Sequence, residues 1–159
     1  MINGHGDDAY RYTAIRANFS SNVYHRVNHD GLNRYLAGCL PCIRSYPEPE
    51  PYALAAELAR LHGVSPEEVC VTNGATEAIY LIAQTFCGSH SAVWIPTFSE
   101  YADACRLHEH RVEGISSLEK LTDDEGIFWL CNPNNPTGQT WDAATLRRLI
   151  VAYPRKLFV

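Results

Sequence analysis

Residues 126–138 read Gly-Ile-Phe-Trp-Leu-Cys-Asn-Pro-Asn-Asn-Pro-Thr-Gly, and this stretch decides the fold. Its first six residues form a short apolar run, which is typical of a strand buried on both faces of a parallel sheet. The loop that follows, residues 132–138, is polar and stiff because it combines three asparagines with two prolines. Open α/β sheets bind ligands at the carboxyl ends of their strands. The loop is therefore a candidate ligand site, although the same residues also make ordinary turns.

The sequence on both sides of this stretch alternates between strand and helix patterns. Such an order predicts an α/β fold, with a mostly parallel sheet, flanking helices and right-handed crossovers. The predicted helices are residues 52–62 with Gly63 as C-cap, 75–86, 99–108 and 141–153 with Thr140 as N-cap, and residues 65–68 form a helical turn. The predicted strands are residues 69–72, 91–95, 111–115, 126–131 and 156–159.

Two regions differ in pattern. Residues 1–50 contain prolines and few periodic apolar residues, so we expect an N-terminal arm that serves as a substrate loop. Residues 51–159 carry the α/β alternation and are expected to form the front part of a large domain. The chain ends on a predicted parallel strand, which needs a connection at its far end and partners on its flanks. We therefore expect the large domain to be incomplete in this chain and the sequence to be part of a longer protein.

Composition narrows the class of protein and its partners. The chain has 159 residues, of which 46% are hydrophobic and 19% charged, and its net charge is −5 at pH 7. A net negative chain has no general attraction for nucleic acid or anionic membranes, so neither is expected as a partner. No window approaches the ~18 apolar residues of a membrane span, and the N-terminus lacks a secretory leader pattern, which favours a cytoplasmic location.

The six cysteines leave a rival interpretation open. Cys70 and Cys131 lie in predicted strands, so we expect reduced, buried thiols. Cys39 and Cys42 have the spacing of a thiol pair, yet no second pair or suitably spaced histidine pair accompanies them. A small thiol-based redox or metal-binding protein is therefore one alternative, and a non-catalytic α/β binding module is another.

Two clusters of titratable residues have a structural interpretation. His108 and His110 are two positions apart, so on a helix they diverge and cannot share a metal. We expect them to be surface residues at a helix end. Asp123, Asp124 and Glu125 are expected in a solvated turn before a strand, and no metal site is expected.

Residues 72–77, Thr-Asn-Gly-Ala-Thr-Glu, connect a predicted strand to a predicted helix. The start of a helix offers free amide groups and a positive dipole end, and Gly74 lets an anion approach closely. The segment is therefore a candidate phosphate site that needs no lysine. An ordinary strand-to-helix turn explains it equally well, and neither the P-loop pattern nor G-x-G-x-x-G is present.

Four motifs occur in a familiar order: Tyr-Pro-Glu-Pro from Tyr46, the segment 72–77, Pro-Thr-Phe-Ser-Glu-Tyr at 96–101, and the loop 132–138. Together they resemble the fold type I pyridoxal-phosphate enzymes of the aminotransferase superfamily. The branch most similar includes histidinol-phosphate aminotransferases and L-threonine-O-3-phosphate decarboxylases. The N-terminal His-Gly and the segment Asn-Phe-Ser-Ser-Asn at 18–22 resemble the decarboxylases.

The resemblance implies a cofactor, pyridoxal 5′-phosphate, and a role for each matching residue. Ala75 and Thr76 would donate main-chain amides to the cofactor phosphate. Tyr101 would stack on the pyridine ring, and Asn135 would donate a hydrogen bond to its 3′ oxygen. Tyr46 would reach the phosphate bound by a neighbouring subunit, so the resemblance also implies a homodimer.

The resemblance also implies a substrate and a reaction. His5 and Asn22 would lie near the phosphate of a small phosphorylated amino acid. The implied activity is decarboxylation of L-threonine O-3-phosphate in cobalamin biosynthesis by a lyase, with histidinol-phosphate transamination as the alternative. The lysine that binds the cofactor covalently is expected beyond Val159, because Lys120 and Lys156 fall outside the motif that carries it.

Overall fold

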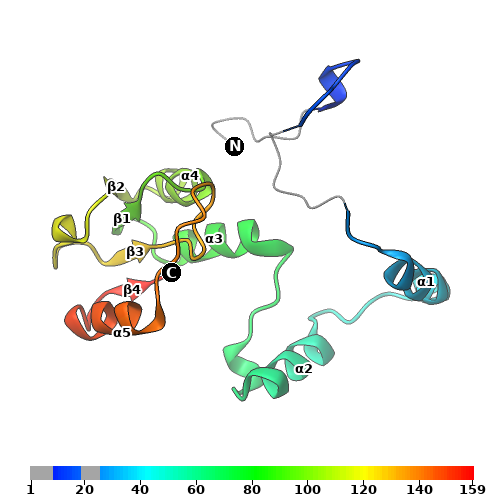
Figure 1. Cartoon of the computed structure of the whole chain (residues 1–159). Helices are drawn as coiled ribbons and strands as arrows, with labels where there is room; N and C mark the ends of the chain where they lie inside the picture. Colours follow the sequence, from blue (N-terminus) through cyan, green and yellow to red (C-terminus); the bar gives the residue numbers. More distant parts are fainter. Residues whose placement is uncertain (1–8, 19–25) are drawn as a thin grey trace. The chain divides into compact units, whose positions relative to one another are not determined.

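The computed structural model describes residues 9–18 and 26–159, and Figure 1 follows them along the chain. Contacts between Cα atoms divide these residues into two units, with the division after Val71. We call the described residues up to Val71 the N-terminal unit, and Thr72–Val159 the sheet unit. The expected division into residues 1–50 and 51–159 concerns the complete protein and stays a prediction.

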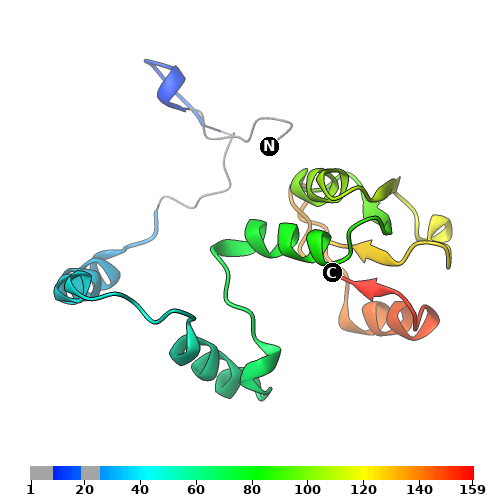
Figure 2. The same cartoon turned by 180° about the vertical axis from the view of Figure 1, so that it is seen from behind.

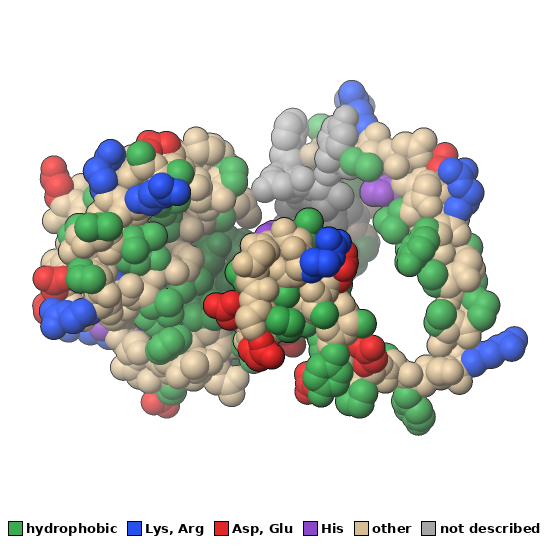
Figure 3. Space-filling view, turned by 90° about the horizontal axis from the view of Figure 1, so that it is seen from below, with side chains coloured by type: hydrophobic (Ala, Val, Ile, Leu, Met, Phe, Trp, Pro, Cys, Tyr) green, Lys and Arg blue, Asp and Glu red, His purple; other side chains and the backbone are tan. Residues whose placement is uncertain are grey.

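The N-terminal unit is helical. Its elements are the 3-10 helix Ala9–Arg11, helix α1 (Asp30–Cys39), the 3-10 helix Leu40–Arg44, helix α2 (Tyr52–His62) and the 3-10 helix Pro66–Glu68. Helix α1 lies within the region expected to be an N-terminal arm with few periodic apolar residues. Its signal was Leu32, Tyr35 and Leu36, whose spacing places them on one face of a helix. These side chains are exposed, and Figure 3 shows hydrophobic groups open to solvent along the N-terminal unit.

Helix α2 and the turn after it agree with the sequence prediction. Gly63 ends α2 in the left-handed conformation, with φ of 66°, which a residue without Cβ adopts at little cost. At the following turn the amide of Ser65 donates to Oε2 of Glu68 at 2.8 Å, which forms half of a capping box. Local residue chemistry is therefore sufficient to place both features.

The predicted strand 69–72 is wrong. Val69 has extended dihedral angles (φ −114°, ψ 119°), yet among the described residues no neighbouring strand pairs with this segment. Cys70 is exposed rather than buried. An apolar, extended segment becomes a strand only when another strand accepts its backbone hydrogen bonds.

The sheet unit contains four parallel strands among the described residues, in the order β2-β1-β3-β4, which confirms the α/β class. Its strands are β1 (His90–Trp94), β2 (Arg111–Ile115), β3 (Ile127–Trp129) and β4 (Leu157–Phe158). Its helices are α3 (Gly74–Thr85), α4 (Glu100–Leu107), the 3-10 helix Leu118–Lys120 and α5 (Ala143–Ala152).

The two faces of the sheet are covered by different helices. Helix α4 connects β1 to β2, and α5 connects β3 to β4 in the opposite direction across the sheet. With right-handed crossovers, opposite directions place the two helices on opposite faces. Figures 1 and 2 show α4 and α5 on the two sides of the strands.

The core alternates along each strand. Val93, Ile127 and Trp129 pack with Ile79 of α3 and Ala104 of α4. The residues between them in the strands point to the other face, where Ala92, Trp94 and Phe128 pack with Ile115 and Leu121. Because both faces are buried, β3 is apolar at every position and β1 is apolar from Ala92 to Trp94.

Helix α5 begins later than expected. Its N-cap is Asp142, whose Oδ1 accepts from the amide of Thr145 at 2.8 Å, so Thr140 is not the cap. Both residues are good caps, and the one whose side chain reaches a free backbone amide becomes the N-cap.

All six cysteines are free, as expected, but only Cys105 is buried. None of the helices in the described segments has the length and apolar character needed to cross a membrane.

His110 is buried, with 6% of its surface exposed, so its expected surface position is wrong. Its Nε2 lies 2.8 Å from the carbonyl oxygen of Ala83, which can only accept a hydrogen bond. Nε2 therefore carries a proton, and in the neutral ring Nδ1 accepts from the hydroxyl of Ser91 at 2.8 Å. The same hydroxyl accepts from Nε1 of Trp129 at 3.2 Å. This chain of bonds joins α3, β1 and β3 inside the core.

Replacing Ser91 by Ala is expected to destabilise the protein by about 1–3 kcal/mol, because Trp129 and His110 then lose a buried partner. The midpoint of denaturant unfolding of the complete protein measures this loss. Ser116→Ala, at an exposed serine, is the matched control and should change little. An equal midpoint for the two variants would contradict the network.

Candidate functional site

The candidate site lies at the carboxyl ends of β1 and β3, which are adjacent parallel strands. The loop after β1 leads into α4, and the loop after β3 leads to α5. The hydroxyl of Thr97 in the first loop donates to Oδ1 of Asn134 in the second at 2.7 Å. The two predicted motifs, residues 96–101 and 132–138, are therefore in contact although they are far apart in sequence.

Tyr101 lies in the first turn of α4 and is half-buried. Its ring centroid is 5.8 Å from that of Trp129 in β3 and 6.2 Å from that of Phe98. Burial, together with a hydrogen bond to Cys131, raises the pKa of Tyr101 to about 12. The phenol therefore stays neutral at physiological pH, and the ring is held by aromatic neighbours in a way that suits stacking on a flat ligand.

The loop after β3 is held at both ends. Nδ2 of Asn132 donates to the carbonyl oxygen of Trp141 at 3.1 Å, and the amide of Trp141 donates to Oδ1 of Asn132 at 2.9 Å. Gly138 has φ of 70°, which closes the turn. Asn135 is half-buried between these fixed points. Its side chain is thus carried by a loop with little freedom.

The start of α3 provides amide donors. Gly74 has φ of 83°, and a Cβ at this position would meet no atom within 4 Å, so the space beside it is open. Ala75 and Thr76 are exposed, and no hydrogen bond to their amides is found within residues 9–18 and 26–159. The N-cap, Asn73, makes no side-chain cap, because its side chain donates to Glu77 at 3.0 Å. Free amides at a helix start are what an anion binds.

The structure brings four of the predicted residues to one edge of the sheet. A helix that packs on a sheet just before a strand runs opposite to that strand, so the start of α3 lies at the carboxyl edge of β1. Tyr101 packs against the same core cluster as Ile79 of α3. Ala75 and Thr76, from α3, thus share this edge with Tyr101 and Asn135.

The other three predicted residues lie outside the described part of the sheet unit. Tyr46 lies in the N-terminal unit and is fully exposed. His5 and Asn22 lie outside the described residues.

Ala75, Thr76, Tyr101 and Asn135 together fit a flat cofactor that carries a phosphate. The open space beside Gly74 and the amides of Ala75 and Thr76 suit the phosphate. The ring of Tyr101 suits an aromatic ring, and the amide of Asn135 suits an oxygen on that ring.

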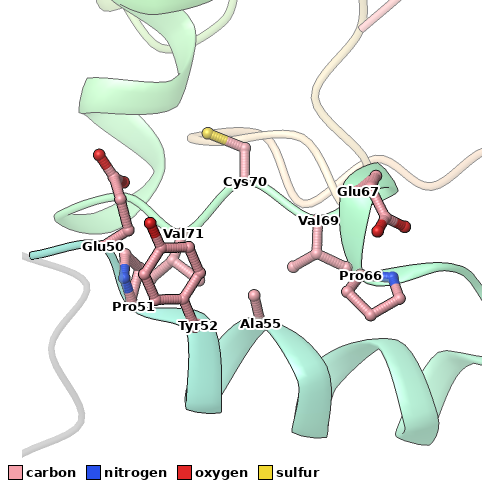
Figure 4. A pocket seen from close by; sticks show the side chains of 9 residues that line it. All are labelled: Glu50, Pro51, Tyr52, Ala55, Pro66, Glu67, Val69, Cys70 and Val71. Atoms are coloured by element: carbon pink, nitrogen blue, oxygen red, sulfur yellow. The ribbon is translucent and has the colours of Figure 1, made fainter. Parts of the chain in front are cut away.

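A separate pocket of about 440 Å³ lies in the N-terminal unit, between α2 and the segment that follows its turn. Figure 4 shows Tyr52 and Pro66 on its two sides and Val69 pointing toward Ala55. Its lining residues include none of the predicted cofactor residues. The pocket therefore does not compete with the site at the sheet edge.

The structure gives little support to Cys39 and Cys42 as a redox or metal-binding pair. Cys39 is the last residue of α1, and Cys42 lies in the 3-10 helix that follows. A redox pair of this spacing is activated at the start of a helix, whereas Cys39 ends α1 and is followed only by a 3-10 helix of five residues. Its position weakens the redox interpretation.

Sequence reasoning missed a buried ion pair. Glu125 was expected in solvent, but 1% of its side chain is exposed, and Nζ of Lys156 lies 3.3 Å from its Oε2. Burial acts to raise the pKa of Glu125, and the hydrogen bonds to the carboxylate from its own backbone, Thr122 and Lys156 outweigh it and lower the pKa. His90 and Glu113 lie near this carboxylate as potential metal ligands, but the Lys156 ammonium already neutralises it.

An α/β unit with helix-start amides, a stacking ring and an amide side chain at one edge is the kind of unit that binds a phosphorylated aromatic cofactor. Residues 20–159 match the family described as Aminotransferase class I and II, and the chain belongs to this family. The expected membership of the aminotransferase superfamily is thereby confirmed, and with it the cofactor expected for this family, pyridoxal 5′-phosphate.

Three individual proteins show how far the similarity extends. The chain is 31% identical over 156 residues to a histidinol-phosphate aminotransferase of Shewanella amazonensis, covering 91% of the chain and 40% of the relative. The structure of L-threonine-O-3-phosphate decarboxylase from Porphyromonas gingivalis matches with a TM-score of 0.83 at 40% identity, covering 88% of this chain and 44% of that one.

The third is histidinol-phosphate aminotransferase from Sinorhizobium meliloti in complex with pyridoxal-5′-phosphate. It matches with a TM-score of 0.72 at 20% identity, covering 81% of this chain and 39% of that one. At this identity the match supports the fold. The chain thus spans about two fifths of the length of the proteins that it matches.

Proposed function

We propose that this chain is the N-terminal part of a pyridoxal-phosphate lyase that decarboxylates L-threonine O-3-phosphate, as in cobalamin biosynthesis. The observation that carries the proposal is the similarity to the Porphyromonas gingivalis decarboxylase in both sequence and structure. The N-terminal His5-Gly6, which resembles the decarboxylases, supports the same substrate.

The residues at the carboxyl edge of the sheet would each hold a different part of the cofactor. When bound, pyridoxal phosphate withdraws electrons from the bond that breaks at the substrate Cα. The amides of Ala75 and Thr76 bind its phosphate at the start of α3. The neutral ring of Tyr101 covers one face and keeps water from it. Asn135 donates to the 3′ oxygen and stabilises negative charge there.

The substrate phosphate supplies the orientation that selects the reaction. His5 and Asn22 would bind it and so fix which bond at the substrate Cα is presented for reaction. The cofactor would supply the electron withdrawal that lets the presented bond break. Presenting the bond to the carboxylate would give decarboxylation, whereas presenting the bond to hydrogen would begin a transamination.

Histidinol-phosphate transamination is the second candidate function, because the Shewanella amazonensis aminotransferase matches nearly the whole chain. Both candidates use the same cofactor site and a phosphorylated substrate. They differ in which bond at the Cα is aligned.

The experiment supplies the complete enzyme with each substrate separately. With threonine phosphate we expect release of carbon dioxide, and with histidinol phosphate and 2-oxoglutarate we expect no glutamate. Glutamate formation without carbon dioxide would assign the protein to the aminotransferases. His5→Ala should reduce the decarboxylation rate, and an unchanged rate would remove His5 from substrate binding.

Three further parts of the proposal concern the complete protein. The lysine that binds the cofactor covalently is expected beyond Val159, and the cytoplasm is the expected location. A homodimer would bring Tyr46 to a neighbouring subunit, and the exposed apolar side chains of the N-terminal unit support such an assembly.

Zinc binding or reversible oxidation at Cys39 and Cys42 would favour the redox alternative, and a protein that binds ligand without turnover would favour the binding module.

A further inference from the structure

Asn134 is buried, although the loop after β3 that carries it is otherwise accessible to solvent. It is 3% exposed, whereas the other residues of the loop after β3 are exposed or half-buried. A buried amide is tolerated when its polar atoms have partners. Nδ2 of Asn134 donates to the carbonyl oxygen of Pro96 at 2.8 Å and to Oγ1 of Thr137 at 2.7 Å. Both hydrogens of the amide are therefore in use.

The other polar atoms of Asn134 complete a cross-link between the two loops. Its Oδ1 accepts from the hydroxyl of Thr97 at 2.7 Å. Its backbone amide donates to the carbonyl oxygen of Gln139, and its own carbonyl oxygen accepts from the amide of Gly138, both at 2.7 Å. The residue thus closes its own loop and ties it to the loop after β1.

The two loops carry the two residues that are proposed to meet the cofactor ring. Asn135 follows Asn134 directly, and Tyr101 lies four residues after Thr97. We infer that Asn134 is a positioning residue, whose side-chain amide holds Asn135 and Tyr101 at the spacing that one cofactor ring requires. This inference rests on the proposed function.

The cross-link needs an amide rather than a carboxylate. Aspartate at this position would still accept from Thr97, but an ionised carboxylate has no hydrogen to donate. The hydroxyl of Thr137 can rotate and donate to it, whereas the carbonyl oxygen of Pro96 can only accept. Asn134→Asp therefore keeps the size of the side chain and loses the bond to Pro96, one of its two side-chain bonds to the loop after β1.

The first test compares variants of the complete, cofactor-loaded enzyme. Asn134→Asp and Thr97→Val are expected to lower kcat by about 10- to 100-fold, because small displacements of positioned groups cost rates of this order. The amount of bound cofactor should stay the same, since its phosphate is held at α3. Thr97→Ser, which keeps the hydroxyl, should restore most of the rate, and Thr140→Ala, at an exposed residue of the same loop, should leave it unchanged.

The second test separates positioning from general support of the fold. If Asn134 acts through Asn135, then Asn134→Asp should cost little further rate in an Asn135→Ala background, because residues that act as a unit are not additive. The visible absorption band of the bound cofactor should also shift in Asn134→Asp. Full additivity, an unshifted band or failure of Thr97→Ser to restore the rate would overturn the inference. A parent enzyme that binds no pyridoxal phosphate would instead overturn the proposed function.

Discussion

Replacing Asn135 by Ala in the complete enzyme is expected to lower turnover by on the order of 10²–10³-fold, because one preorganised donor to a developing charge is lost. The loop that carries Asn135 is fixed by Asn132 and Asn134, so the donor is aimed before the substrate arrives. The phosphate contacts at α3 are separate, and the affinity for the cofactor should therefore change much less than kcat. Steady-state kinetics and the stoichiometry of bound cofactor measure the two effects.

Gln139→Ala is the matched control for this substitution. Gln139 carries the same kind of side chain in the same loop, but it is exposed. Its replacement should leave kcat within about twofold, as is usual for a surface change away from special features. Activity of Asn135→Ala within the same range would mean that Asn135 does not face the cofactor.

Replacing Glu125 by Gln is expected to destabilise the protein by about 3–5 kcal/mol, which is the range for breaking a buried ion pair from one side. The variant leaves the ammonium of Lys156 without its ion-pair partner, although only 2% of this side chain is exposed. Denaturant unfolding of the complete protein measures the loss. The double variant with Lys156→Met should regain much of it, because the charges then disappear together.

The pH dependence of the ion pair has a definite sign. The pKa of Glu125 in the folded protein is lowered from its ordinary value of 4.5, as burial is outweighed by hydrogen bonds from its own backbone, Thr122 and Lys156. Its contribution to stability is therefore present above about pH 4.5 and is lost as the pH falls through the lower folded pKa.

Glu125→Gln should remove this part of the acid sensitivity. Asp124→Asn, at the exposed neighbour, should leave it in place. Equal acid sensitivity in the parent and in Glu125→Gln would contradict the assigned pair.

Local pattern was sufficient for the α/β class and for bringing the two predicted loop motifs to one edge of the sheet. Strand and helix periodicity, the cap at Gly63 and the turn residues after β3 all act within a few positions of one another. The rule that ligands bind at the carboxyl ends of parallel strands then brought Tyr101 and Asn135 to one edge. Of the predictions from such short-range signals, the α/β class and the cap at Gly63 agree with the structure, whereas the strand 69–72 and the cap at Thr140 do not.

The tertiary structure decided the features that require a partner residue far away in the sequence, such as strand pairing and buried ion pairs. The segment 69–72 is apolar enough for a strand, but a strand requires a neighbour to pair with, and none is present among the described residues. Composition cannot distinguish the exposed Asp124 from the buried Glu125, whose partner Lys156 lies 31 positions away.

Asn134 follows the same principle, because residues 37 and 38 positions earlier bind its side chain and bury it, while the asparagine two residues before it stays exposed. Sequence periodicity records which face of an element is apolar. Hydrogen bonds and ion pairs between distant residues form only after the chain has folded, and they select which polar side chains can be buried.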